Sequence, residues 1–84
     1  MSNIQYRVQV RVSTPRGEFC GFYGFPEETQ DRCYDTRQYV CNNAHVMNYL
    51  RLASDDGEIV IPGDILRRSV LTVKTVSTFK KDEA

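Results

Sequence analysis

The clearest pattern along this chain is a strict alternation of apolar and polar residues near its N-terminus. From residue 4 to residue 12 every second side chain is Ile, Tyr or Val, and the positions between them carry Gln or Arg. A two-residue period is typical of a β-strand with one buried and one solvated face. Turn-forming residues 13–17 and an aromatic-rich stretch over 18–25 follow, so residues 4–25 predict a β-hairpin.

Three more strands are predicted in the second half of the chain. Residues 46–53 and 58–61 flank the turn 54–57, whose glycine takes a left-handed conformation at little cost. Residues 62–66 predict one helical turn, and the Val- and Thr-rich residues 69–78 predict the fifth strand. Five strands in this order predict a small, strongly bent antiparallel barrel.

The segment 26–45 is an insertion that forms either a helix or an ordered long loop. Its apolar residues fit one helical stripe only if the stem of Arg37 is buried along it; these residues are Cys33, Val40, Cys41 and Ala44. The fold class is therefore mainly β, or α+β if the insertion is helical. Residues 1–79 form one domain, and 80–84 form a polar tail.

Two glycines interrupt the second predicted strand. Gly21 and Gly24 lie among aromatic residues, where glycine indicates a bulge or a tight bend. Small barrels need such bends at their corners, so these positions agree with the predicted fold.

Residues 56–73 resemble the closing half of an Sm-like or Src-homology-type small barrel. The hairpin with Gly17 and the stretch Phe19-Cys20-Gly21-Phe22 are loosely similar to the first half of the Sm pattern. The resemblance implies a five-stranded barrel and, by extension, a ring that binds RNA. Phe25-Pro26-Glu27 stands where Sm proteins carry the Asp and Asn that hold RNA.

The overall charge is balanced, because 11 basic residues face 11 acidic ones in 84 residues. This balance excludes binding to nucleic acid or membranes by bulk electrostatic attraction. No apolar run approaches the roughly 18 residues that span a bilayer, and the N-terminus lacks the apolar core of a signal peptide. We therefore expect a cytoplasmic protein with reduced cysteines and no membrane partner.

The charges are nevertheless segregated along the chain. If the first and last strands are neighbours, basic side chains gather on one solvent face, as a stripe that meets phosphates or an acidic protein surface. A solvated strand face accounts for the same residues without any partner. The predicted basic stripe comprises Arg7, Arg11, Arg67, Arg68 and Lys74.

Aromatic residues cluster in the second predicted strand. Alternation places Phe19, Tyr23 and Phe25 on one face and Phe22 on the other, so one set lies under the insertion or forms an exposed interface. Cover by the insertion is the favoured interpretation, with Tyr34, Tyr39 and Tyr49 as packing residues.

Three thiols and one imidazole form a minor candidate for a structural zinc site. Cys20, Cys33, Cys41 and His45 have the right chemistry, but their spacing contains no close ligand pair. Buried, reduced thiols are the favoured interpretation, and we expect no metal and no cofactor.

No phosphate-binding loop, nucleophile elbow or metalloprotease motif occurs, so we expect no enzymatic activity. The first hypothesis is a non-enzymatic protein-interaction module that also self-associates, such as a viral or mobile-element accessory protein that binds or inhibits a host component. The alternative is an Sm-like ring that binds RNA or single-stranded DNA, and a zinc-stapled binding domain ranks third.

Overall fold

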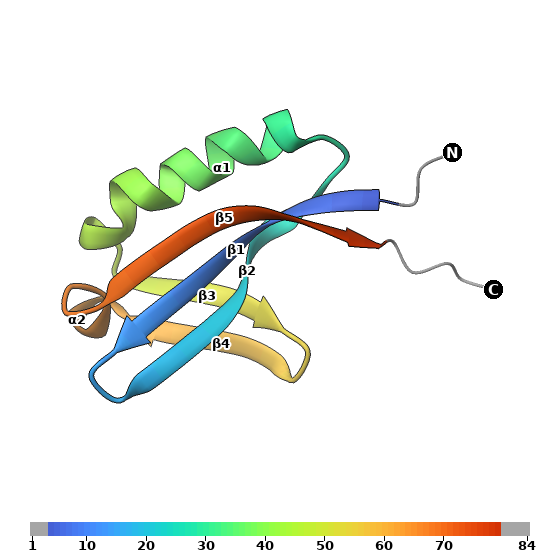
Figure 1. Ribbon diagram of the computed structural model, residues 1–84. Helices are drawn as coiled ribbons and strands as arrows, with labels where there is room; N and C mark the ends of the chain where they lie inside the picture. Colours follow the sequence, from blue (N-terminus) through green and yellow to red (C-terminus); the bar gives the residue numbers. More distant parts are fainter. Residues whose placement is uncertain (1–3, 80–84) are drawn as a thin grey trace.

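A computed structural model describes residues 4–79, which form one antiparallel sheet of five strands with one long helix (Figure 1). The strand order is β4-β3-β2-β1-β5. The elements are β1 (Ile4–Thr14), β2 (Gly17–Glu27), α1 (Gln30–Asn43), the 3-10 turn η1 (Ala44–Val46), β3 (Tyr49–Ser54), β4 (Gly57–Pro62), α2 (Gly63–Leu66) and β5 (Val70–Phe79). The predicted mainly β class with an inserted helix is confirmed. The predicted tail, 80–84, lies outside the described residues.

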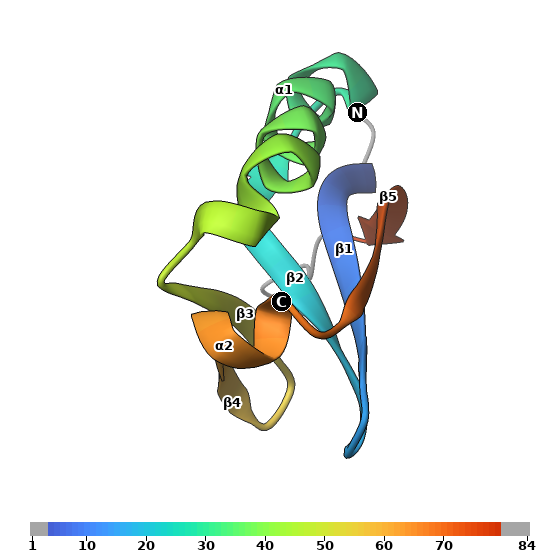
Figure 2. The same ribbon diagram turned by 90° about the vertical axis from the view of Figure 1, so that its left-hand side faces the viewer.

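The sheet is not closed, so the prediction of a barrel is wrong in this respect. β4 and β5 are its two edges, and β2 pairs with β3 at one position, Phe22 opposite Ala53. In Figure 2, α1, α2 and the β3–β4 hairpin lie on one side of the long strands β1 and β5. The apolar face is therefore covered by a helix and a bent hairpin, and the core forms without closure.

The core contains the apolar half of the N-terminal alternation. Val8, Val10 and Val12 are buried, as the two-residue period predicts. They pack in one cluster with Leu50 and Leu52 of β3 and with residues of both helices and β4, namely Cys33, Val40, Ile61 and Leu66. This cluster fixes the positions of the β1–β2 turn, β4 and α2 relative to one another.

The inserted segment is a helix, but a shorter one than 26–45. Thr29 is its N-cap, and its hydroxyl oxygen accepts a hydrogen bond from the Arg32 N–H at 3.3 Å. Pro26 and Glu27 belong instead to β2, which pairs there with Tyr6 of β1. At the other end η1 occupies residues 44–46, so the third strand begins at Tyr49.

The predicted stripe of the helix is mostly confirmed. Cys33, Val40 and Ala44 are buried and Arg37 is half-buried, whereas Cys41 is exposed. Cys41 directly follows Val40, so a turn of about 100° along the helix carries it off the buried stripe.

Gly21 and Gly24 of β2 stand where the backbone requires glycine. Gly24 has φ +79°, and the β1–β2 register shifts between Tyr6 and Val8, so a bulge follows Tyr23. A Cβ atom on Gly21 would lie 2.7 Å from the Leu52 Cβ, because β3 crosses β2 at that point. The predicted bulge is confirmed at Gly24, whereas the close approach of β3 at Gly21 was not predicted.

Candidate functional site

The register of β1 and β5 places part of the basic stripe on one face. Gln9 lies opposite Lys74, so Arg7, Arg11 and Lys74 all project from the side of the sheet opposite Val8 and Val10. The expectation that the first and last strands are neighbours is confirmed.

Three of the stripe's arginines already have partners within the chain. Arg7 donates a hydrogen bond from Nη2 to the Gly24 carbonyl at 3.0 Å, and its guanidinium lies 4.6 Å from the Phe22 ring centroid. It therefore braces the bulge in β2. Arg11 Nε lies 3.7 Å from a Glu18 carboxylate oxygen. Arg67 and Arg68 lie in the turn after α2, so neither of them belongs to the strand face. Arg67 forms an ion pair with Asp64, with Nη2 and Oδ1 2.7 Å apart.

The predicted aromatic cluster is divided among separate surfaces. Phe22 lies under Arg7 on the outer face, and Phe25 follows the bulge and is 86% exposed. Tyr23 is covered by the inserted helix, where its ring stacks on Tyr39 with centroids 6.5 Å apart. Phe19 borders a hollow at the other end of β2. The predicted cover by the insertion is thus confirmed for Tyr23, while the bulge breaks the alternation before Phe25.

A second hollow of about 400 Å³ lies where β2 and α1 meet the start of β3. Its lining includes Tyr23, Tyr39 and Tyr49, with Met47, Asn48 and Arg51 completing the set. Burial raises the pKa of Tyr23 above its usual 10.0, and the neighbouring Tyr39 and Tyr49 raise it further. The Tyr23 hydroxyl is therefore protonated at neutral pH.

The four residues of the zinc hypothesis lie apart in the fold. Cys33 is buried under the sheet, whereas Cys20 projects from the outer face and Cys41 lies on the exposed side of α1; His45 is in η1. Over residues 4–79 no group of three His, Cys, Asp or Glu side chains is placed to hold a metal ion. Burial, and then the nearby Glu27, raises the pKa of the Cys33 thiol.

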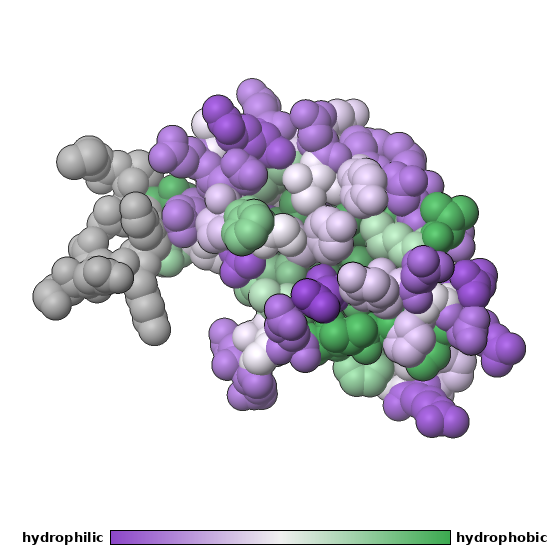
Figure 3. All heavy atoms as spheres, turned by 180° about the vertical axis from the view of Figure 1, so that it is seen from behind, coloured by the Kyte–Doolittle hydropathy of each residue, from purple (hydrophilic) through white to green (hydrophobic). Residues whose placement is uncertain are grey.

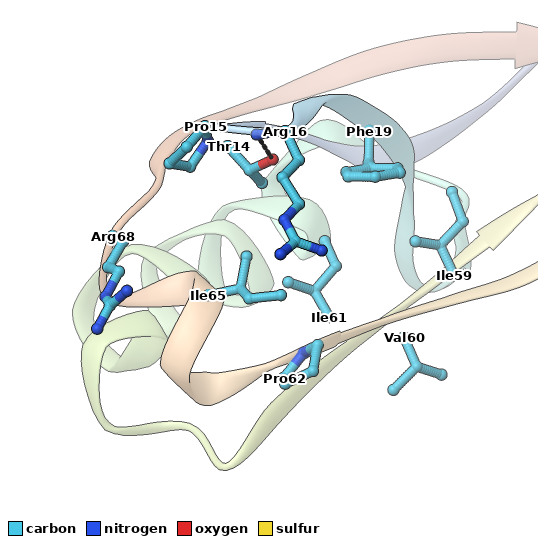
Figure 4. A pocket seen from close by; sticks show the side chains of 10 residues that line it. All are labelled: Thr14, Pro15, Arg16, Phe19, Ile59, Val60, Ile61, Pro62, Ile65 and Arg68. Carbon is cyan, nitrogen blue, oxygen red and sulfur yellow. Dashed lines mark hydrogen bonds between the residues drawn. The ribbon is translucent and has the colours of Figure 1, made fainter.

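One hollow on the described surface was not predicted from the sequence. It has a volume of about 420 Å³ and lies between the β1–β2 turn on one side and β4 with α2 on the other (Figure 4). Seen from behind in Figure 3, apolar side chains gather over β4 with polar residues around them. We call this hollow the β4 groove; it is lined by Thr14, Pro15, Arg16, Phe19, Ile59, Val60, Ile61, Pro62, Ile65 and Arg68.

The two walls of the β4 groove are held by local hydrogen bonds. In the β1–β2 turn, the Thr14 hydroxyl accepts from the Arg16 N–H at 3.1 Å and donates to the Gly17 carbonyl at 2.8 Å. On the opposite side, the Gly63 N–H donates to the Asn48 carbonyl at 2.8 Å, which fixes the start of α2 against the entry to β3. The groove is therefore a preformed feature of the fold.

The surface of the β4 groove is mostly apolar, and its lining contains two arginines, Arg16 and Arg68. Phe19, Val60 and Ile65 are 42%, 53% and 38% exposed, while Ile61 at the base is 3% exposed. In Figure 4 the Arg16 side chain extends from the turn across the hollow toward Ile61 and Ile65. This combination suits a mainly apolar ligand that also carries negative charge.

One signal in the sequence points to this surface. The fourth strand reads Ile59-Val60-Ile61, apolar at three successive positions where a half-buried strand would alternate. Such a run predicts burial on both faces, yet Val60 is 53% exposed. Only Phe19 and Arg68 of the groove were among the predicted site residues, each assigned to a different surface.

No helix within residues 4–79 is both long and apolar enough to cross a membrane. Comparison with known proteins finds no matching family model, curated protein or solved structure. The resemblance to Sm-like and Src-homology-type barrels therefore stays a prediction from the sequence.

Proposed function

We propose that this chain is a non-enzymatic protein-interaction module and that the β4 groove receives a segment of a partner protein. The observation that carries the proposal is the gathering of exposed apolar side chains, Phe19, Val60 and Ile65, around one preformed hollow of about 420 Å³. Contiguous apolar surface of this kind, rimmed by polar residues, is typical of binding sites. The volume lies within the range of about 300–1,000 Å³ that is usual for ligand pockets.

Burial of the exposed apolar side chains favours an occupied groove. Apolar surface removed from water contributes about 25 cal/mol per Å². The exposed parts of Phe19, Val60 and Ile65 gain this contribution only when a partner covers them. Since both walls are fixed by hydrogen bonds, little additional ordering opposes binding.

The nucleic-acid alternative has less support from the geometry. Arg7, Arg11 and Arg67 are engaged with Gly24, Glu18 and Asp64. A phosphate backbone would have to displace these contacts, and the zero net charge provides no long-range attraction. That the partner is a host component inhibited by this protein stays a prediction.

Matched variants test the proposed function. Phe19→Asp and Ile65→Asp place a carboxylate in the β4 groove, and Phe25→Asp places the same charge on an exposed aromatic residue outside it. Affinity purification from the native host provides candidate partners, and calorimetry with each purified partner measures its affinity. We expect the groove variants to weaken binding by about tenfold or more, as at an interface hot spot, and Phe25→Asp to leave it unchanged.

Equal affinity of all three variants and the wild-type chain would exclude the β4 groove as the binding surface. Thermal unfolding of each variant shows that a loss of binding is not a loss of folding.

A further inference from the structure

We infer that the occupant of the β4 groove is an extended peptide segment that adds to the free edge of β4 as a sixth strand and directs a carboxylate to Arg16. The inference rests on the proposed function and specifies its partner. Three observations support it: the unpaired edge of β4, the direction in which the groove runs, and the unpaired charge above it.

The first observation is the direction of the backbone groups of β4. The Gly63 N–H bonds to the Asn48 carbonyl of the chain entering β3, directly beyond the Tyr49–Pro62 pair. Backbone groups of successive strand residues point to opposite edges. Ile59 and Ile61 therefore bond to β3 like Gly63, and the groups of Glu58, Val60 and Pro62 point to the other edge.

That other edge has no strand beside it. β4 is the last strand of the described sheet and pairs with β3 alone. The N–H and C=O groups of Glu58 and Val60 and the C=O of Pro62 are thus free to pair with an added strand. Proteins commonly bind extended peptides at such edges, because the main-chain hydrogen bonds require no particular sequence.

The second observation is that the β4 groove follows this edge. Four successive residues of β4, Ile59 to Pro62, line it. Side chains of successive strand residues point to opposite faces, so a hollow on one face would meet only every second residue. A hollow that meets all four runs along the edge of the strand, where an added strand would lie about 4.8 Å away.

The third observation is the charge on Arg16. Its guanidinium extends over apolar residues in Figure 4, and among residues 4–79 no acidic group forms an ion pair with it. A neutral occupant would remove water from this guanidinium without replacing the hydrogen bonds that the water forms with it. An occupant with a carboxylate at that position forms a charge-assisted hydrogen bond, which in arginine pairs is often bidentate.

These three features define the chemistry of the ligand. Alternate side chains of the added strand face the apolar wall formed by Phe19 and Ile65, so they are apolar. An Asp or Glu of the segment lies next to Arg16. β5 offers the second unpaired edge, but neither hollow described above is lined by residues of β5.

A random ten-residue peptide library displayed on phage, selected on the immobilised 84-residue chain, tests the inference. We expect enriched peptides with apolar residues at alternate positions and at least one Asp or Glu. Binding of the synthetic peptides is then measured by fluorescence anisotropy. N-methylation of the edge-facing amides should weaken binding about tenfold or more, because each methyl group removes a donor and blocks strand pairing.

A double-mutant cycle tests the role of Arg16. In the wild-type chain we expect replacement of the peptide Asp by Asn to weaken binding about tenfold, and in Arg16→Gln we expect no further loss. The control variant Arg32→Gln removes an exposed arginine of α1 outside the groove. In this variant, replacement of the peptide Asp by Asn should still weaken binding about tenfold.

The outcomes separate the inference from the proposed function. Loss of binding with Ile65→Asp shows that a peptide occupies the groove. If such peptides tolerate N-methylation at every position, or carry no acidic residue, the inference is overturned and the groove stays a binding site. Peptides that bind Ile65→Asp and wild type equally contradict both. A selection that enriches no peptide counts against the inference. A dimer seen by light scattering that Ile65→Asp dissociates identifies a second copy as occupant and overturns it too.

Discussion

Leu66 and Ile65 are neighbours on α2 with opposite exposure, and their replacement by alanine separates stability from binding. Leu66 is 1% exposed in the core, whereas Ile65 is 38% exposed in the β4 groove. Truncation of a fully buried leucine costs about 2–5 kcal/mol, through lost burial and the cavity that remains. A domain of 84 residues has a total stability of about 4–13 kcal/mol. Leu66→Ala therefore removes a large fraction of it.

For a chain of this size, 1 kcal/mol corresponds to about 4–8 °C in the melting temperature. Leu66→Ala should thus lower the melting temperature by roughly 8–40 °C, and Ile65→Ala by less than about 8 °C, because Ile65 is already partly in water. Circular dichroism during thermal unfolding measures both. Equal losses from the two variants would refute the placement of Leu66 in the core and of Ile65 in the groove wall.

Three further predictions concern the close approach of β2 to β3, the partly buried Tyr23 and the buried Cys33. Gly21→Val should destabilise the fold by about 3 kcal/mol or more in urea unfolding, because its Cβ atom would lie 2.7 Å from a side chain of β3; a stable variant would contradict this contact. The raised pKa of Tyr23 favours its protonated form in the folded state, so stability is retained below about pH 10 and falls as the pH rises through the folded pKa. Tyr23→Phe should flatten this fall in urea unfolding between about pH 8 and 11, and an unchanged slope would argue against the burial of Tyr23. In the native chain, Ellman's reagent should modify Cys20 and Cys41 rapidly and Cys33 only on unfolding, whereas three fast thiols would contradict a buried Cys33.

The sheet was predictable because its signals are local. The alternation over residues 4–12 identifies a half-buried strand, and Asp56-Gly57 identifies a tight turn, from neighbouring residues alone. The bulge near Gly24 was also predictable, since a glycine inside an aromatic-rich strand commonly marks a break in the strand pairing.

The start of the helix and the openness of the sheet depend on contacts between distant residues. Glu27 and Glu28, directly after Pro26, look like the first turn of a helix, but β1 offers Glu27 a partner in Tyr6 and extends β2 instead. Likewise, no local signal shows that α1 covers the apolar face of the sheet and makes closure unnecessary. Tertiary pairing overrides local propensity at both places.

The β4 groove combines residues from three separate parts of the chain. Phe19 and Arg16 come from the first hairpin, Val60 from β4 and Ile65 from α2. Sequence patterns group residues that are close along the chain, so they assigned Phe19 to an aromatic cluster and gave Val60 and Ile65 no part in a site. The partners of Arg7 and Arg67 are likewise fixed only by the fold, so no sequence pattern indicated them.

A backbone-amide NMR titration of the 84-residue chain with a selected peptide tests the proposed binding site at the level of single residues. Occupation of the β4 groove predicts the largest chemical-shift changes at the amides of Phe19, Val60 and Ile65, which surround the hollow. Changes confined to Arg11 and Lys74, on the outer face of β1 and β5, would contradict it and place binding on the basic stripe.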